Sequence, residues 1–162
     1  MRKKEKLLKK IRKKEGEENM KYVVLVSHGT FAPGLHSVLN MLAGGGREDI
    51  LSTSLEDGMG ADEFAVNFGK LIEPVKEDDE IILLADIIGG SPLTTALDVL
   101  TKKGLLAKTT AFGGMNLPMA LTAALMKDAL DTESLKTSLI SESRDAIKEM
   151  ELKLDDDEED DI

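Results

Sequence analysis

Two short apolar runs constrain the fold of this chain more than any other feature. Residues 22–26 (YVVLV) and 81–85 (IILLA) are rich in β-branched side chains, and each run ends in polar and glycine residues. Short continuous apolar runs of this kind are typical of parallel strands, which are buried on both faces. Residues 49–55 predict a weaker strand, and residues 107–112, closed by two glycines, predict a fourth. The chain is therefore expected to build a parallel sheet.

The segments between these runs have the spacing of amphipathic helices. Apolar side chains recur three and four residues apart, which places them on one face of a helix. The apolar stripes are Leu35, Val38, Leu39 and Leu42; Phe64, Phe68, Leu71, Ile72 and Val75; and Leu93, Ala96, Leu97 and Leu100. Two more helices are predicted, one running from just after Asn116 to about Lys127 and one over residues 132–150.

The order of these elements predicts an α/β fold. Strands and helices alternate through short connections, which implies an open, mainly parallel, doubly wound sheet with helices on both faces. We expect flavodoxin-like winding with the strand order 2-1-3-4. In such a sheet, ligands bind beyond the carboxyl ends of the strands, close to the point where the winding reverses. The residues that follow each strand are therefore the candidates for function.

The composition excludes several classes of function. A chain of 162 residues, 41% of them hydrophobic, is sized for a single core. It has no apolar stretch long enough to cross a bilayer, no cysteine, and a net charge of −10 that disfavours nucleic acid binding. We expect a cytoplasmic protein with no direct membrane insertion, no nucleic acid partner, no metal and no other cofactor. His28 and His36 are the two residues that could provide imidazole chemistry. We interpret His36 as a helix-surface residue.

The two ends of the chain differ from its body in charge. Residues 1–19 hold nine basic and four acidic side chains, whereas residues 155–161 are seven consecutive acids. We expect residues 151–162 to form a disordered, solvated tail. Residues 1–19 are either a basic surface arm or, as we prefer, a mis-assigned start, because the Gly-Glu-Glu before Met20 can be encoded by the purine-only codons of a ribosome-binding site. This leaves a domain over residues 20–150.

A histidine and an aspartate follow two of the predicted strands. His28 ends the first strand, and Asp86 follows the third. With the order 2-1-3-4 these strands are neighbours, so the two side chains should face each other. An imidazole held at Nδ1 by a carboxylate presents Nε2 as a fixed lone pair, as a phosphoryl acceptor or a general base requires.

Glycines and a helix start surround this predicted pair. Gly29, Gly89 and Gly90 would let backbone N–H groups approach an anion, and the helix that begins at Ser91 points its positive end into the same space. We expect Ser91 either to cap that helix or to donate to a phosphoryl oxygen. The alternative is that His28 is an ordinary loop histidine, the carboxylate caps a turn, and the glycines only shape tight corners. Spacing alone favours neither interpretation.

Three motifs follow the predicted strands: SHGTFA at residues 27–32, DIIGGSP at residues 86–92 and GMNLPM at residues 114–119. In this order, over residues 20–150, the chain resembles the mannose-type IIA family of the bacterial sugar phosphotransferase system. The resemblance implies a homodimer in which the motif histidine accepts a phosphoryl group from the histidine phosphocarrier protein HPr. It also implies transfer to a IIB component of a membrane IIC/IID complex.

The resemblance also implies a role for each motif residue. His28 would be phosphorylated and Asp86 would orient it. The implied phosphoryl-binding residues are Gly29, Gly89, Gly90 and Ser91, and the implied rim residues are Asn116 and Pro118. Some relatives place a hydroxyl or aromatic residue at the two positions after the aspartate, where this chain has isoleucines, so no phosphate contact is expected from those side chains. Because only twelve residues follow Met150, we expect the IIB component to be a separate chain.

Several related functions remain open at this point. The phosphocarrier subunit of dihydroxyacetone kinase uses a similar mechanism, although the GGSP of residues 89–92 favours the sugar-transport branch. A chelatase or a histidine phosphatase can also begin with a strand that ends in His-Gly. The former typically needs a second histidine at the metal, and the latter an arginine where this chain has Ser27. A binding module that retains the fold is a non-enzymatic alternative. Mannose, fructose, sorbose and amino sugars are all possible cargo.

Overall fold

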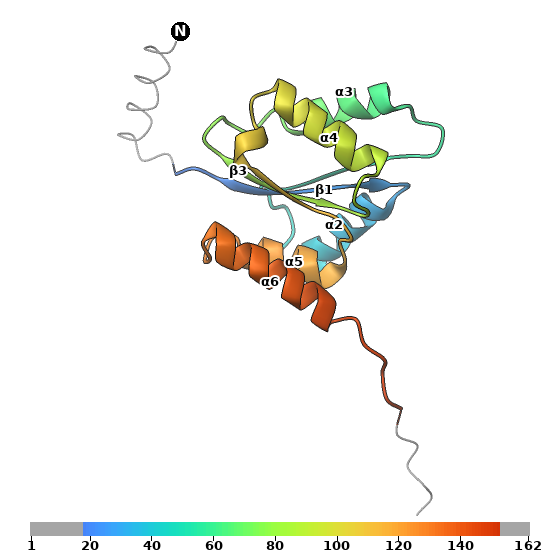
Figure 1. The fold of residues 1–162 in the computed structure, drawn as a ribbon, viewed down its shortest axis with the longest axis vertical. Helices are drawn as coiled ribbons and strands as arrows, with labels where there is room; N and C mark the ends of the chain where they lie inside the picture. Colours follow the sequence, from blue (N-terminus) through green and yellow to red (C-terminus); the bar gives the residue numbers. More distant parts are fainter. Residues whose placement is uncertain (1–17, 153–162) are drawn as a thin grey trace, which may run out of the picture.

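The computed structural model describes residues 18–152, which form three layers around one sheet (Figure 1). Within this range the strands are β1 (Lys21–His28), β2 (Ile50–Leu55), β3 (Glu80–Ala85) and β4 (Thr109–Phe112). They pair in parallel in the order β2-β1-β3-β4, which confirms the predicted winding. Nearly all of the predicted basic extension and acidic tail lies outside the described residues.

Helices cover both faces of the sheet (Figure 1). One face carries α2 (Phe31–Leu42), α5 (Leu117–Met126) and α6 (Thr132–Asp145). The other face carries α3 (Ala61–Leu71) and α4 (Ser91–Lys102). A short 3-10 helix, η1 (Leu106–Lys108), leads into β4. Among the described residues, no helix has the length and apolar character that a membrane span requires.

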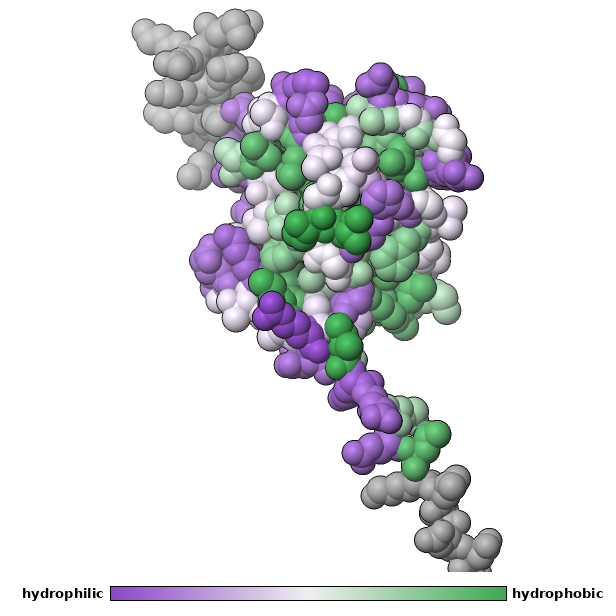
Figure 2. All heavy atoms as spheres, turned by 45° about the vertical axis from the view of Figure 1, so that its right-hand side comes forward, coloured by the Kyte–Doolittle hydropathy of each residue, from purple (hydrophilic) through white to green (hydrophobic). Residues whose placement is uncertain are grey.

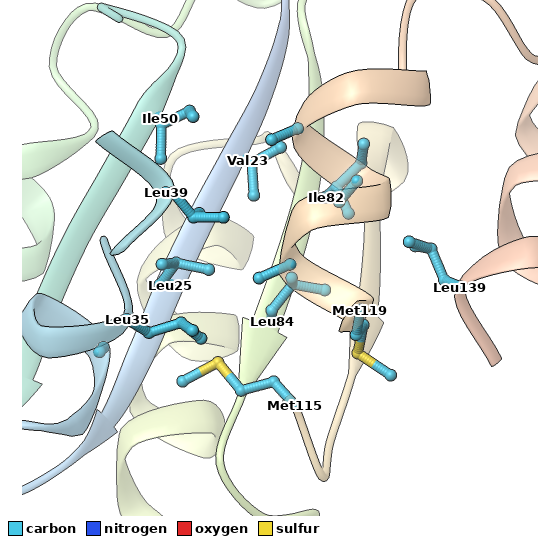
Figure 3. Packing of buried hydrophobic residues seen from close by; sticks show 14 of the residues in the cluster. Val23, Leu25, Leu35, Leu39, Ile50, Ile82, Leu84, Met115, Met119 and Leu139 are labelled. Atoms are coloured by element: carbon cyan, nitrogen blue, oxygen red, sulfur yellow. The ribbon is translucent and has the colours of Figure 1, made fainter. Parts of the chain in front are cut away.

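The central strand β1 divides the hydrophobic core in two. Successive side chains of a strand point to opposite faces of the sheet, so a strand that is apolar at every position must be covered on both sides. Val23 and Leu25 pack toward α2 and α5 (Figure 3), whereas Val24 and Val26 pack toward α3 and α4. All four valine and leucine side chains are fully buried, and each contributes about 1.5–3 kcal/mol through removal from water. The residue that ends this strand, His28, therefore stands on a rigid support.

Three predicted boundaries differ from the structure. The last helix ends at Asp145 rather than Met150, because Ile147 and Met150 do not reach the core and a helix gains most of its stability from packing. The helix predicted from the second apolar stripe also ends early, since α3 ends at Leu71 even though Val75, the last residue of that stripe, is still buried. The fourth strand begins at residue 109 rather than 107, because the Lys108 N–H bonds to the Leu105 carbonyl and closes a turn.

Candidate functional site

His28 and Asp86 meet at the carboxyl ends of two adjacent strands, β1 and β3. Nδ1 of His28 lies 2.8 Å from Oδ2 of Asp86, and the same oxygen accepts the backbone N–H of His28 at 2.9 Å. One carboxylate oxygen thus holds both the backbone and the ring of the histidine. The ring remains 44% exposed, and its other nitrogen, Nε2, lies on the edge away from this contact. The structure therefore brings together the pair that the sequence indicated.

The surroundings of Asp86 favour its ionised form. Burial raises the pKa of this carboxyl, but hydrogen bonds from the backbone and ring of His28 and from the Ile87 N–H lower it by more, so the pKa lies below its ordinary value. The Ile87 N–H donates to Oδ1 at 3.0 Å. An ionised carboxylate can only accept hydrogen bonds, so Nδ1 of His28 carries a proton, and in the neutral form of the ring the lone pair is on Nε2. This tautomer suits a nucleophile that acts through Nε2.

Glycine is required at the turns beside His28. Gly29 and Gly89 have φ values of 57° and 74°, in the left-handed region that side chains disfavour. Gly90 has an ordinary φ, but a Cβ at this position would lie 2.8 Å from Cε1 of His28. The imidazole therefore packs directly against the backbone of Gly90, which brings the ring close to the start of α4.

Fewer groups are available to hold an anion than the sequence predicted. The N–H of Gly29 donates to the Leu55 carbonyl at 2.9 Å, so this group is engaged within the protein. Ser91 does not cap α4, whose N-cap is Gly90, and the serine is exposed. The N–H groups of a first helical turn have no partner within the helix and attract anions. The start of α4, where the Ser91 side chain is exposed, therefore has the character of an anion site and lies next to His28 through Gly90.

The two predicted rim residues lie in the loop after β4 and the first turn of α5. The side chain of Asn116 accepts the Met119 N–H at 3.0 Å and donates to the Ser143 carbonyl at 3.0 Å. It thereby caps α5 and ties this helix to α6, so both hydrogen bonds of the Asn116 side chain stabilise the fold. Pro118 is half-buried in the first turn, where its missing N–H costs nothing.

Ser27 helps to fix the chain on either side of His28. The sequence pointed to this residue only as a serine where a histidine phosphatase would need an arginine. Its side chain is fully buried, and its hydroxyl accepts the Ala32 N–H at 2.7 Å. This bond fastens the first turn of α2 to the end of β1, on either side of His28. A lone serine in an otherwise apolar run was the signal available in the sequence.

His36 is not the simple surface residue that its position in a helix suggested. It is half-buried, and its Nδ1 lies 2.7 Å from the Ser52 hydroxyl of the edge strand β2. Burial lowers the pKa of His36, so its neutral form is favoured. Within residues 18–152, no cluster of three or more histidine, aspartate or glutamate side chains is arranged to hold a metal ion.

Comparison with known proteins identifies the family. A family model described as the PTS system fructose IIA component (EIIA-man) matches residues 22–140. This chain belongs to that family. Its membership confirms the resemblance drawn from the three motifs and makes the protein a IIA component of a sugar phosphotransferase system.

Known proteins resemble this IIA protein in sequence, and two with solved structures share its fold. The fructose-specific EIIA component of Bacillus subtilis (strain 168) is 21% identical over 126 residues, which cover 78% of this chain and 84% of the relative. The EIIA component of Streptococcus agalactiae is 25% identical, with a TM-score of 0.68 over 80% of this chain and 97% of its own. The mannose/sorbose-specific IIA subunit of Enterococcus faecalis is 20% identical, with a TM-score of 0.69 over 83% of this chain and 98% of its own.

Proposed function

We propose that this IIA protein is a cytoplasmic phosphocarrier in which Nε2 of His28 accepts a phosphoryl group from HPr. The protein then passes this phosphoryl group to a separate IIB component of a membrane IIC/IID complex, and that complex couples phosphoryl transfer to sugar uptake. The observation that carries this proposal is the 2.8 Å contact between His28 Nδ1 and Asp86 Oδ2, because it leaves Nε2 available as the nucleophile.

The proposed step is an in-line transfer between two imidazoles. The lone pair of His28 Nε2 forms a new P–N bond while the P–N bond of the donor phosphohistidine breaks, and the donor imidazole keeps the electron pair. Positive charge develops on the His28 ring, and the Asp86 carboxylate stabilises it through the Nδ1 proton. The phosphoramidate is already an activated donor, so positioning and charge stabilisation supply the catalysis.

The phosphoryl oxygens are assigned to the start of α4. Gly90 packs against Cε1 of His28 and is the N-cap of α4. The candidate donors are therefore the N–H groups of Gly89 and Gly90, the free N–H groups of the first turn, and the Ser91 hydroxyl. The positive end of a helix twelve residues long favours negative charge there. Gly29 serves the turn instead, since its N–H is already bonded.

The test is phosphorylation by phosphoenolpyruvate, the general phosphotransferase enzyme and HPr, followed by measurement of intact mass. The wild type should gain one phosphoryl group that is lost on brief acid treatment. His28→Ala should gain none, whereas His36→Ala should behave like the wild type because its ring is held by Ser52 away from the anion site. An acid-labile phosphoryl group on His28→Ala would overturn the proposal, and transfer to a dihydroxyacetone kinase rather than a IIB component would favour the alternative pathway.

We also propose that the protein is a homodimer. The outer edge of β4 is unpaired within residues 18–152, and unpaired edges invite another chain. Residues 146–152 lead away from the body (Figure 1), and their large apolar side chains are uncovered. Ile147, Met150 and Leu152 are 78%, 80% and 79% exposed. A second copy that covers this segment and the β4 edge would pair the free backbone groups of the strand and remove the apolar side chains from water.

A further inference from the structure

The helix that follows His28, α2, is capped from the strand before it. Thr30, the N-cap residue of α2, makes no side-chain hydrogen bond to the helix. The capping oxygen belongs instead to Ser27 in β1, whose hydroxyl accepts the N–H of Ala32, the second residue of α2, at 2.7 Å. An N-cap side chain normally makes this bond to the second or third residue of its own helix. The Ser27 hydroxyl therefore holds the start of α2 against the end of β1.

This hydrogen bond closes the turn at His28. The turn is held at three points that belong to different parts of the fold. The His28 N–H donates to Oδ2 of Asp86, after β3, at 2.9 Å. The Gly29 N–H donates to the carbonyl of Leu55, at the end of β2, at 2.9 Å. Ser27 makes the third attachment, and without it the turn would be free to move on its α2 side and to carry the imidazole with it.

A second buried serine lies beside Ser27 and provides an internal comparison. Ser54 of β2 is the register partner of Ser27, and the alternation of both strands places the two side chains on the α2 face of the sheet. They are 0% and 5% exposed, and the helical layers close over the sheet on the face that Figure 2 shows. Within residues 18–152, the Ser54 hydroxyl has no hydrogen-bond partner. Of these two enclosed hydroxyls, only that of Ser27 is bonded to the turn.

We propose that Ser27 is a positioning residue for phosphoryl transfer, which holds the His28 ring so that Nδ1 faces Asp86 and Nε2 faces the donor. This inference rests on the proposed function and adds a residue on which its geometry depends. Ser27 is fully buried on the α2 face, whereas the His28 ring packs against Gly90 at the start of α4, on the other face. The serine therefore acts only through the turn. A displacement of about 1 Å in a reacting group can cost roughly a hundredfold in rate.

The test compares Ser27→Ala with Ser54→Ala, which removes a hydroxyl of similar burial that is bonded to none of residues 18–152. Phosphoryl transfer is followed by rapid quench over a range of HPr concentrations. Ser27→Ala should lower the maximal rate by roughly tenfold to a hundredfold. The HPr concentration for half-maximal rate should stay within about twofold, because a buried residue makes no contact with the donor. Ser54→Ala should keep the wild-type rate within about twofold.

A spectroscopic measurement separates positioning from a loss of stability. Nitrogen NMR of isotope-labelled protein distinguishes the two neutral tautomers of His28 and needs no phosphoryl donor. The wild type should carry the ring proton on Nδ1. Ser27→Ala should shift the population toward the tautomer with the proton on Nε2, because the contact with Asp86 is loosened. Ser54→Ala should leave the tautomer unchanged.

The outcomes separate this inference from the proposed function. Ser27→Thr keeps the hydroxyl and should transfer within about threefold of the wild-type rate. A folded Ser27→Thr protein as slow as Ser27→Ala, or a Ser27→Ala protein too unstable to fold, would assign the serine to stability alone. A wild-type rate or an unchanged tautomer in Ser27→Ala would also overturn the positioning role. If HPr does not phosphorylate the wild type while the tautomer still responds to Ser27→Ala, the proposed function fails and the positioning of the ring stands.

Discussion

Replacing Asp86 by asparagine tests the contact on which the mechanism depends. The change keeps the size of the side chain and removes its charge. In the wild type, Oδ2 accepts the backbone N–H and the Nδ1 proton of His28, and Oδ1 accepts the Ile87 N–H. An asparagine has one oxygen, so in either orientation its NH₂ group faces a donor. We therefore expect a folded protein that has lost at least one hydrogen bond and the charge beside the ring.

The size of the effect follows from the distance and the exposure of the pair. Opposite unit charges 4 Å apart attract by about 1 kcal/mol in water and about 4 kcal/mol at an effective dielectric constant of 20. His28 is 44% exposed and Asp86 is 17% exposed, so the site lies between these limits. A loss of about 1.5–3 kcal/mol from the transition state corresponds to a rate of transfer that is roughly 10-fold to 100-fold lower.

Rapid-quench measurement of phosphoryl transfer from HPr provides the assay, with circular dichroism to check the fold. Asp57→Asn is the matched control, because Asp57 is an exposed acid at the same edge of the sheet, in the loop after β2. The control should transfer at the wild-type rate. A folded Asp86→Asn protein that transfers as fast as the wild type would refute the orienting role of the carboxylate.

Three further predictions follow from the geometry. Gly90→Ala should lower transfer by at least about tenfold with little change in melting temperature, because its Cβ would lie 2.8 Å from the His28 ring; wild-type transfer would count against this packing. Hydrogen bonds from Arg47 hold the pKa of Asp49 well below its ordinary range, so the stability that Asp49 contributes is present above about pH 4 and is lost as the pH falls further. Urea titrations should therefore show Asp49→Asn to be about 1–3 kcal/mol less stable than the wild type at pH 7, with the difference shrinking below pH 4; a constant difference would contradict this. Removal of residues 146–162 should convert a dimer into a monomer in light scattering, whereas an unchanged mass would exclude this segment from the interface.

Local patterns in the sequence were sufficient for most of the fold. Buried parallel strands need continuous apolar runs and their helices need apolar stripes, so the runs at residues 22–26 and 81–85 and the stripes between them revealed the elements. The order 2-1-3-4 was expected from the flavodoxin-like winding of such alternating chains, and the structure confirms it together with the meeting of His28 and Asp86. The end of the last helix did not follow, since whether residues 146–150 stay helical depends on a packing partner.

The details of the site were decided by tertiary structure. The sequence alone determined which residues stand at the strand ends, because strand boundaries are local properties of the chain. It could not show that one Asp86 oxygen bonds His28 twice, that the Gly29 N–H is engaged by Leu55, or that the imidazole packs on Gly90. Each of these contacts joins residues from different strands or loops, and its geometry depends on the register and twist that the packed sheet imposes. Only the folded chain therefore distinguishes the groups available to a phosphoryl group from those already used by the protein.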